Sequence, residues 1–428
     1  MRQSIHLFVI SVITLACFCV HQAALGQGVL LRSVGAVNAS VGGTATAMPL
    51  DACGALYWNP GSISALKKNE ISFGLELVEG KSRVDSTLDS TSGYFAGSTK
   101  GESGVIPVPS MGFVWSTSRR SPFTFGLGMG AIGGAASLYP HKPLSEPDGN
   151  PVLAAHGRSA TVIVLQVTPT VSAQLTERLS VGVAPIIDLA SLNINPMSLG
   201  RTIHPDTSLM TYGTRYVWGG GFQIGALYDF QNNFKAGFMF KSPIWAEKLY
   251  FAGTYYDNNH NPVAATPTFQ FNLPMTLSAG ISYDGFRNTV IGMDVRYLDY
   301  GNTAGLQKGV VDGVVEGLGW ESVFSINIGA ERRINNKVRV RMGYCWNENP
   351  IPGRSAILAI SAPMITQHVL SCGLTKEIAK GLEVSAAYAH SFKAKVEGQF
   401  VSPDPVGRGT VTNTLSANAL FATVTKKW

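Results

Sequence analysis

Residues 268–283 read TFQFNLPMTLSAGISY and alternate between apolar and polar or small side chains. The apolar residues occupy the odd positions, Phe269, Phe271, Leu273, Met275, Leu277, Ala279, Ile281 and Tyr283. Period-two alternation is typical of a β-strand with one apolar face, and 16 residues is far longer than the usual strand of about five or six. The stretch predicts a long strand over 267–284, with Pro274 near the point where it leaves an apolar environment.

The same alternation recurs along the chain and predicts about fourteen strands. We place them near 69–78, 107–117, 122–132, 158–174, 178–194, 215–229, 233–245, 267–284, 288–301, 320–334, 337–348, 365–377, 380–394 and 413–428. Short turns and long connections alternate between these segments, as in outer-membrane barrels with short periplasmic turns and long outer loops. A β-sandwich would also alternate, but its strands would be shorter. The pattern therefore predicts an all-β fold, a transmembrane antiparallel β-barrel over residues 69–428.

Composition supports the same class. The chain has 428 residues, of which 45% are hydrophobic and only 14% charged, with 47 glycines. A soluble protein carries about 25% charged residues, and a disordered one carries high charge and few aromatics. After residue 25 no run of about 18 apolar residues occurs, which excludes a helical membrane protein and leaves a closed barrel. The basic residues are scattered, so we expect no nucleic-acid partner.

The first 26 residues have the pattern of a signal peptide. Arg2 supplies a positive charge, residues 5–20 are mostly apolar, and Ala24-Leu25-Gly26 is a small-x-small cleavage site. We expect the mature chain to begin at Gln27 and to reside in the outer membrane of a Gram-negative bacterium. The alternatives are an uncleaved anchor and a lipid-modified Cys17.

Three cysteines remain in the mature chain, with no metal-like spacing. Alternation places Cys345 on the inner face of its strand and Cys372 on the outer face of a neighbouring strand. A disulfide between them would have to cross the sheet, so we predict free thiols. We expect neither a metal nor a cofactor.

Residues 27–68 do not fit the barrel pattern. They are small and glycine-rich, and then carry the apolar residues Leu56, Tyr57 and Trp58. A barrel of about fourteen strands has a lumen too wide for wall side chains to fill. We therefore predict that this segment folds inward as a plug, or hatch; the alternative is a loose periplasmic tail.

At these residues the chain resembles the FadL/TodX family of outer-membrane transporters for long-chain fatty acids and other hydrophobic compounds. Asp51 to Gly61 is similar to the family's Asp…Ala-x-x-x-Asn-Pro-Ala stretch, with Gly61 in place of the commoner alanine. Further similar stretches follow in order: Phe125-Gly126-Leu127-Gly128 and Ala131-Ile132-Gly133, Phe240-Lys241-Ser242-Pro243-Ile244, Leu273-Pro274, Arg341-Met342-Gly343-Tyr344 and Asn349-Pro350-Ile351. The resemblance covers essentially the whole mature chain and implies passive uptake, with outer-membrane lipid around the barrel.

The resemblance also implies a mechanism. A ligand caught by outer loops passes to a pocket inside the barrel and leaves sideways, into the membrane, through a gap near the third strand. It places Asn59, Pro60 and Gly61 of the hatch beside Gly133, which would sit at the bend of that strand. Glycines permit such a break, although they also permit close packing around a plug.

The same resemblance suggests basic residues in the pocket. The candidates for substrate binding are Arg158, Arg296, Arg339 and Arg341. Because a barrel interior is polar in any case, the alternative for each is a structural ion pair. Glu321, near a position where the family suggests a lysine, would repel a carboxylate and leaves hydrocarbons open beside fatty acids.

Other functions remain in competition at this stage. A general diffusion porin would explain the barrel but not the apolar hatch, and a structural or adhesin barrel is a further alternative. An outer-membrane enzyme would need a serine and a histidine on neighbouring inward positions, which the sequence does not offer. We expect a monomeric transporter of hydrophobic small molecules that is not an enzyme.

Overall fold

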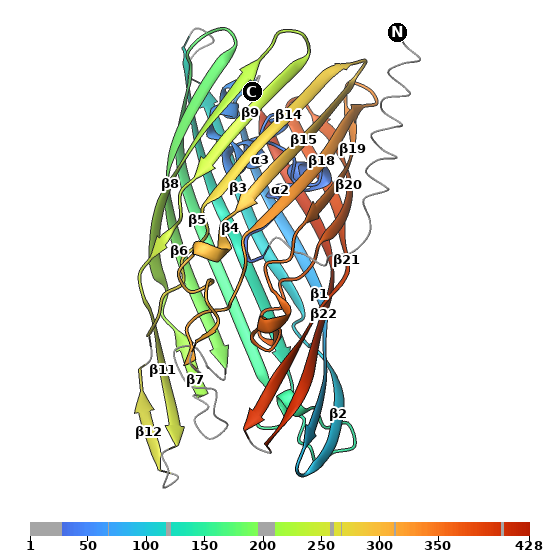
Figure 1. Cartoon of the computed structure of the whole chain (residues 1–428). Helices are drawn as coiled ribbons and strands as arrows, with labels where there is room; N and C mark the ends of the chain where they lie inside the picture. The colour runs from blue at the N-terminus through green and yellow to red at the C-terminus, as the bar shows by residue number, and fades with distance from the viewer. Residues whose placement is uncertain are drawn as a thin grey trace.

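The computed structural model describes residues 28–66, 68–116, 121–195, 210–256, 261–266, 268–311, 314–403 and 406–428. These residues form a closed antiparallel β-barrel, and the segment before the first strand lies inside one end of it (Figure 1). The expected signal peptide, residues 1–26, lies outside the described residues. Among the described residues, no helix is long and apolar enough to cross a membrane.

The barrel wall has fourteen strands, as the alternation predicts, and each pairs with its neighbours in chain order. They are β1 (Glu70–Ser90), β3 (Val105–Ser116), β4 (Phe123–Tyr139), β5 (Arg158–Gln174), β6 (Leu179–Asn195), β8 (Val217–Asp229), β9 (Phe234–Lys241), β14 (Thr276–Phe286), β15 (Thr289–Leu298), β18 (Val323–Arg333), β19 (Val338–Asn347), β20 (His368–Ala379), β21 (Leu382–Pro403) and β22 (Val406–Lys427).

The barrel closes where its first and last strands meet. β1 pairs with β22 from Glu70↔Lys427 to Ser90↔Gly407, so the wall begins and ends at the same rim. Figure 1 shows the short turns at this rim, at the top, and the long connections at the other end. Because outer-membrane barrels have short periplasmic turns, this is the periplasmic rim.

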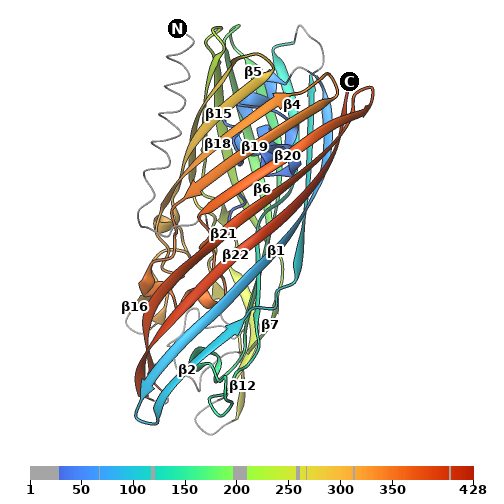
Figure 2. The ribbon, with the colours of Figure 1, turned by 90° about the vertical axis from the view of Figure 1, so that its right-hand side faces the viewer.

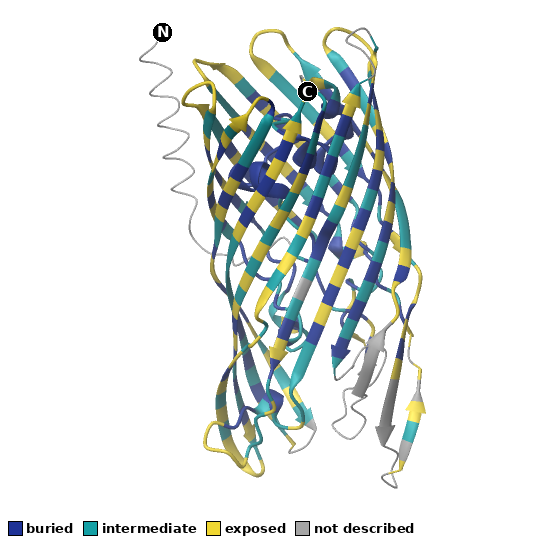
Figure 3. Ribbon diagram, turned by 180° about the vertical axis from the view of Figure 1, so that it is seen from behind, coloured by how far each residue is buried: buried dark blue, intermediate teal, exposed yellow. Residues whose placement is uncertain are grey.

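Side chains alternate between the lumen and the lipid along each strand, which gives the banded pattern of Figure 3. On β1 the outward residues Phe73 and Leu75 are exposed, whereas Ser72, which precedes Phe73, is buried. Cys345 is buried and Cys372 is exposed, and these two and Cys53 are free, which confirms the prediction of free thiols.

Four strands are longer than the sequence predicted. β1 continues to Ser90 and β4 to Tyr139, and β21 and β22 form one long hairpin across the expected loop at 395–412 (Figure 2). The outward residues of β1 change from apolar to charged at Glu79 and Lys81. Alternation of apolar residues therefore ends where the strand leaves the lipid, but backbone pairing continues into water because it does not depend on that face.

The stretch at 267–284 is not one strand. Thr268–Phe269 is β13, pairing with β11 outside the barrel wall, and β14 begins only at Thr276. Phe271 and Leu273 are buried, whereas Ile281 on β14 faces the lipid and is exposed. Pro274 lacks an N–H donor and separates the two parts. The prediction of a strand there was right for its second half only.

The outer end of the barrel carries short elements. The strands are β2 (Gly93–Lys100), β7 (Met210–Thr214), β10 (Trp245–Ala246), β11 (Leu249–Tyr256), β12 (Pro262–Ala265), β13 (Thr268–Phe269), β16 (Val310–Val311) and β17 (Val314–Val315). The 3-10 helices are η2 (Pro151–Leu153), η4 (Tyr300–Asn302), η5 (Gly353–Ser355) and η6 (Leu358–Ile360).

The hatch, residues 28–66, contains three short helices inside the periplasmic end of the lumen (Figure 1). They are α2 (Gly35–Ser40), α3 (Ala52–Trp58) and the 3-10 helix η1 (Pro60–Ala65). The Asp51 carboxylate accepts a hydrogen bond from the Gly54 N–H (3.2 Å) and so caps α3. Asn59 ends α3, and Pro60 then begins η1, where its missing N–H is not needed.

Glycines on the inner face of the wall let the hatch backbone approach closely. A Cβ on Gly112 of β3 would lie 2.7 Å from the Cys53 nitrogen, and one on Gly225 of β8 would overlap the Asn59 side chain. Similar overlaps with hatch atoms would occur at Gly182, Gly237, Gly329 and Gly343. The wall therefore packs closely against the hatch backbone on several sides of the barrel.

This packing predicts that Gly225→Val will dislodge the hatch without opening the wall. The valine side chain would occupy the space of the Asn59 amide, while the strand ladder stays paired. We expect folded protein, judged by heat-modifiable migration, with ion conductance in planar bilayers raised by about tenfold or more, as for a hatch destabilised by about 1.4 kcal/mol. Gly220→Val is the control, because Gly220 faces outward on the same strand and its Cβ would meet only the Ile186 oxygen, at 3.8 Å. Equal conductance of the two variants would contradict this packing role.

Candidate functional site

Two cavities lie within the barrel between the hatch and the outer loops. The inner cavity has a volume of about 200 Å³ and is lined by residues 28–33 of the hatch and by β1, β3, β4 and β20–β22. The outer cavity has a volume of about 50 Å³ and lies among the outer connections. Val29 and Met364 line both, so the cavities are neighbours separated by side chains.

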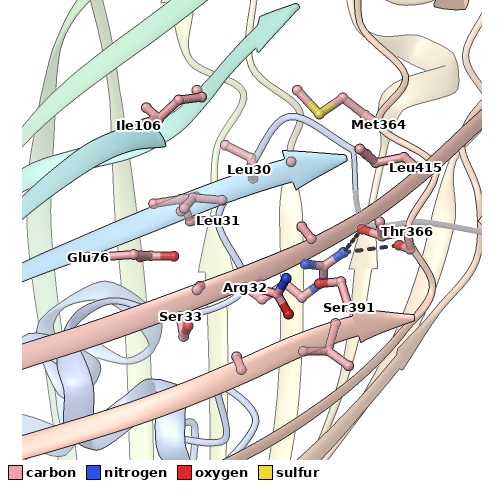
Figure 4. Close-up of a pocket in the computed structure, with 18 of the residues that line it drawn as sticks. Leu30, Leu31, Arg32, Ser33, Glu76, Ile106, Met364, Thr366, Ser391 and Leu415 are labelled. Atoms are coloured by element: carbon pink, nitrogen blue, oxygen red, sulfur yellow. Dashed lines mark hydrogen bonds between the residues drawn. The ribbon is translucent and has the colours of Figure 1, made fainter. Parts of the chain in front are cut away.

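The inner cavity is mostly apolar. Leu30 and Leu31 reach it from the hatch, and Ile106, Met364 and Leu415 reach it from the wall and an outer loop (Figure 4). Apolar walls with few polar groups are typical of sites for small hydrophobic molecules.

Arg32 supplies the positive charge of the inner cavity. Its Nη2 donates to the Thr366 carbonyl (3.0 Å) and hydroxyl (2.5 Å), and its Nε donates to Asn347 Oδ1 (3.3 Å). Burial lowers the pKa of Arg32, and the charges of Cys345 and Glu76 oppose that shift. The guanidinium is thus held in one orientation with N–H groups to spare, because it has five donors.

Glu76 supplies the acidic side chain of the same cavity. It lies on the inward face of β1, between the lipid-facing Leu75 and Leu77. Glu76 and Arg32 both line the cavity (Figure 4), yet they form no ion pair with each other. Within the described part of the chain, the Glu76 carboxyl has no hydrogen-bond partner.

The outer cavity is lined mainly by aromatic and aliphatic side chains, among them Phe269, Phe271 and Trp320. Arg158, at the start of β5, is the basic residue of this lining, and its Nε donates to the Val152 carbonyl (3.3 Å). Arg158 is therefore the one sequence-derived arginine that the structure places in a cavity. Glu321 lies outside the cavity lining and pairs with Arg354 (2.6 Å), both side chains being exposed.

Arg296 lines neither cavity. Its side chain is fully buried, pairs with Asp294 (2.9 Å) and donates to the Gly43 carbonyl of the hatch (2.6 Å). The guanidinium carbon lies 3.3 Å from the centre of the Trp58 ring, a cation–π contact. Asp294 in turn accepts from the N–H groups of Ala45 (2.9 Å) and Thr46 (3.0 Å). This pair anchors the hatch to β15.

Arg339 and Arg341 also lie away from both cavities, near the periplasmic rim. Arg341 pairs with Glu331 (2.7 Å) and Arg339 pairs with Glu383. Lys427 joins Glu383 (3.2 Å) to Glu70 (3.3 Å). For Arg296, Arg339 and Arg341, the contacts are those of structural ion pairs.

Asn59, Pro60 and Gly61 pack against the wall near the periplasmic rim. The Asn59 amide donates to the carbonyls of Thr46 (2.6 Å) and Ala226 on β8 (2.9 Å). The Gly61 carbonyl accepts from the hydroxyls of Ser172 on β5 (3.2 Å) and Ser180 on β6 (2.8 Å).

Gly133 lies elsewhere, and the structure does not bring it to these residues. On β4, the neighbour of η1 is Gly126, where a Cβ would lie 3.2 Å from the Ile63 side chain. Gly133 is seven residues further along β4, about 20 Å away at the rise of a strand. It pairs instead with Leu30, at the other end of the hatch.

The wall is interrupted between β3 and β4. Their pairing ends at Ser110↔Gly130, and the next bond that β4 receives from the segment leading into β3 runs from the Glu102 N–H to the Leu138 carbonyl (2.8 Å). Pro107 of β3 has no N–H, and the next proline, Pro109, removes a donor from the same edge of the strand. A β-bulge between Ala131 and Gly133 then turns β4.

The hatch covers this interruption from inside. The Leu31 N–H donates to the Ile132 carbonyl (2.8 Å), and Leu30 forms a bridge to Gly133. The inner cavity reaches the same place, since Ile106 of β3 and Gly134 and Ala136 of β4 line it. The cavity, the hatch segment 28–33 and the wall interruption therefore meet at one point.

Sequence reasoning missed Arg32 and Glu76. Arg32 lies in a segment without periodicity, so nothing marked it as facing a cavity. Glu76 carried a usable signal, because it alternates with Leu75 and Leu77 and so points inward on a strand whose outer face is apolar. Among the described residues, no group of His, Cys, Asp or Glu side chains could hold a metal ion.

Comparison with known proteins agrees with this geometry. The family model described as outer membrane protein transport protein (OMPP1/FadL/TodX) matches residues 16–427. No curated protein sequence matches the chain.

Three solved structures are similar over almost the whole chain. A FadL homologue from Pseudomonas aeruginosa has a TM-score of 0.74 at 14% identity, covering 93% of this chain and 99% of its own. The toluene transporter TodX from Pseudomonas putida has a TM-score of 0.70 at 15% identity, covering 94% and 100%. The toluene transporter TbuX from Ralstonia pickettii has a TM-score of 0.66 at 18% identity, covering 93% and 99%. At these identities the likeness establishes the fold.

The start of α3 predicts a pH-dependent hatch. Burial raises the pKa of Asp51 to about 7, the Glu70 carboxylate adds to the shift, and the Gly54 N–H, Arg341 and Lys427 oppose it. An undocked Asp51 ionises near pH 4. The docked hatch therefore binds the proton more tightly, and docking is strongest below about pH 4 and weakens as pH rises through about 7. We expect ion conductance in planar bilayers to rise over this range and then level off.

Asp51→Asn should remove this part of the pH dependence, because asparagine caps a helix equally well and does not ionise. Asp284→Asn is the control, since its partly exposed carboxylate, near the periplasmic end of β14, pairs with Lys235 of β9 (3.0 Å). The same pH profile in wild type and Asp51→Asn would show that Asp51 does not govern the hatch.

Proposed function

The chain belongs to the OMPP1/FadL/TodX family of outer-membrane transport proteins for hydrophobic compounds, and we propose that it moves them through two cavities to a lateral exit between β3 and β4. The observation that carries this proposal is that the inner cavity reaches the wall interruption. Gly134 and Ala136 of β4 line the cavity although the β4 ladder to β3 has already ended at Gly130.

The outer cavity is the first station of the route. Its aromatic lining lies among the outer connections, where Phe269, Phe271 and Trp320 offer apolar surface to a ligand arriving from outside. Val29 and Met364 separate it from the inner cavity. Methionine is flexible and adapts to different shapes, so rotation of Met364 opens the passage with little rearrangement.

The exit is lateral because the hatch blocks the path along the barrel axis to the periplasm. The hatch packs on wall glycines at the periplasmic end, and Arg296, Asp294 and the Asn59 amide hold it in place. An apolar ligand also gains nothing by entering periplasmic water, since burial of apolar surface in lipid is favourable by about 25 cal/mol per Å². Between β3 and β4 the ligand has only the hatch residues 28–33 to displace.

The charges of the route favour an uncharged ligand. Arg32 of the inner cavity already donates to Thr366 and Asn347, and Glu76 lines the same space. A fatty-acid carboxylate there would lie beside a second acidic group, Glu76, and the two would compete for the one positive charge of Arg32. The solved relatives include two toluene transporters, which is consistent with a small neutral ligand. One chain holds both cavities and the interruption, so the route needs no second copy.

A bulky residue at the interruption should slow transport. Ala136→Phe places a large side chain on the edge of β4 where the inner cavity reaches the wall. We expect uptake of radiolabelled toluene by cells carrying the protein to fall by about tenfold, as for about 1.4 kcal/mol of added barrier. Binding to the purified protein should persist, because the cavity lies before the exit.

Ala279→Phe is the matched control. Ala279 faces outward and is exposed on β14, away from the interruption, so this phenylalanine meets lipid only. Both variants should show normal heat-modifiable migration. Normal uptake by folded Ala136→Phe protein would reject the lateral exit and point to a path through the hatch.

A further inference from the structure

The inner cavity is lined by one acidic and one basic side chain that form no ion pair with each other. Glu76 projects from β1 and Arg32 from the hatch, and both line the cavity (Figure 4). Arg32 is oriented by Asn347 and Thr366 rather than by Glu76. In the part of the chain that the structure describes, no N–H or O–H group donates to the Glu76 carboxyl.

Glu76 is half-buried, and a carboxyl that faces a largely apolar cavity without a protein donor is costly, since it has lost bonds to bulk water and gained none from the protein. The surroundings do not relieve this cost, because Leu31, Val78 and Leu415 are among the apolar neighbours that line the same space. The missing partner is therefore a donor brought by whatever occupies the cavity.

Glu76 and Arg32 together also limit which kind of molecule can occupy the cavity. Glu76 accepts hydrogen bonds, and the free N–H groups of Arg32 donate them. A hydroxyl does both at once, so it satisfies the two side chains together. A carboxylate only accepts hydrogen bonds and would compete with the acidic Glu76 for the positive charge of Arg32, whereas a pure hydrocarbon would leave the Glu76 carboxyl without a partner.

We propose that Glu76, acting with Arg32, makes the inner cavity selective for small hydroxyl-bearing apolar molecules of the phenol type. The proposal rests on the transport function proposed above and specifies its ligand. The size agrees, because a cavity of about 150 Å³ already binds benzene and this one has about 200 Å³. A single substituted ring therefore fits, with its hydroxyl at the polar end and its ring against the apolar wall.

Three ligands of one shape test the head group. p-Cresol, p-xylene and p-toluate place a hydroxyl, a methyl or a carboxylate on the same toluene frame. Their binding to purified full-length protein in detergent is measured by calorimetry. We expect wild type to bind p-cresol about tenfold or more tightly than p-xylene, and p-toluate most weakly.

Variants at Glu76 test whether this side chain sets the relative affinities of the three ligands. Glu76→Leu should remove the preference for p-cresol over p-xylene. Glu76→Gln keeps the shape and an acceptor but removes the acidic group that competes for Arg32, so it should keep the preference for p-cresol and raise p-toluate affinity by about tenfold. Glu79→Gln is the control, because Glu79 is exposed on the outward face of the same strand and pairs with Lys81 (3.6 Å). Heat-modifiable migration verifies that each variant is folded.

The outcomes separate the two proposals. Equal binding of p-cresol and p-xylene to wild type, or an unchanged preference for p-cresol in folded Glu76→Leu, would overturn the role of Glu76 while leaving transport through the cavity intact. No binding of any of the three ligands would overturn this inference. Failure of the lateral exit is detected separately, by normal toluene uptake in the Ala136→Phe variant.

Discussion

Complete pairing of the wall backbone is the constraint on which this molecule depends. A strand edge in hydrocarbon leaves N–H and C=O groups without partners, and each such group costs several kcal/mol, so only a closed barrel is stable. Closure is achieved by the long β1–β22 ladder. The interruption between β3 and β4 is tolerated because Pro107 and Pro109 have no N–H to leave unpaired, and because Leu31 of the hatch bonds to Ile132. The two prolines therefore interrupt the ladder and, because they lack N–H groups, also make the interrupted edge stable.

The lumen of a barrel this wide is filled by a hatch that noncovalent contacts hold against the wall. Wall glycines such as Gly112 let backbone approach backbone, which fixes the hatch by shape. The Arg296–Asp294 pair fixes it by charge, since Arg296 donates to the Gly43 carbonyl and Asp294 accepts from two hatch N–H groups. Burying such a pair adds little net stability, but breaking it leaves a buried charge, so the contact specifies position more than strength.

The hatch segment 28–33 links binding to exit. Val29 lies between the two cavities, Arg32 gives the inner cavity its positive charge, and Leu30 and Leu31 cover the wall interruption. A ligand that displaces this segment acts on the cavity and on the exit together. Only a few backbone bonds hold the segment to β4, so the rearrangement does not disturb the ladders of the wall.

The barrel, its number of strands, the hatch and the family could all be predicted from the amino-acid sequence, because alternation, turn spacing and ordered motifs are local properties of the chain. The sequence misjudged the ends of strands such as β1 and β21, since the ladder continues in water where the apolar signal stops. Which charges face a cavity became clear only from the three-dimensional structure. Arg296 pairs within its own strand, Arg341 with the adjacent strand and Arg339 with the next strand but one, whereas Arg32 and Glu76 line the cavity without pairing with each other. Strand alternation indicates on which face of the wall a residue lies. Whether an inward residue contacts a charged partner, the hatch or a cavity depends on strand register and on the path of the hatch, whose sequence has no periodicity.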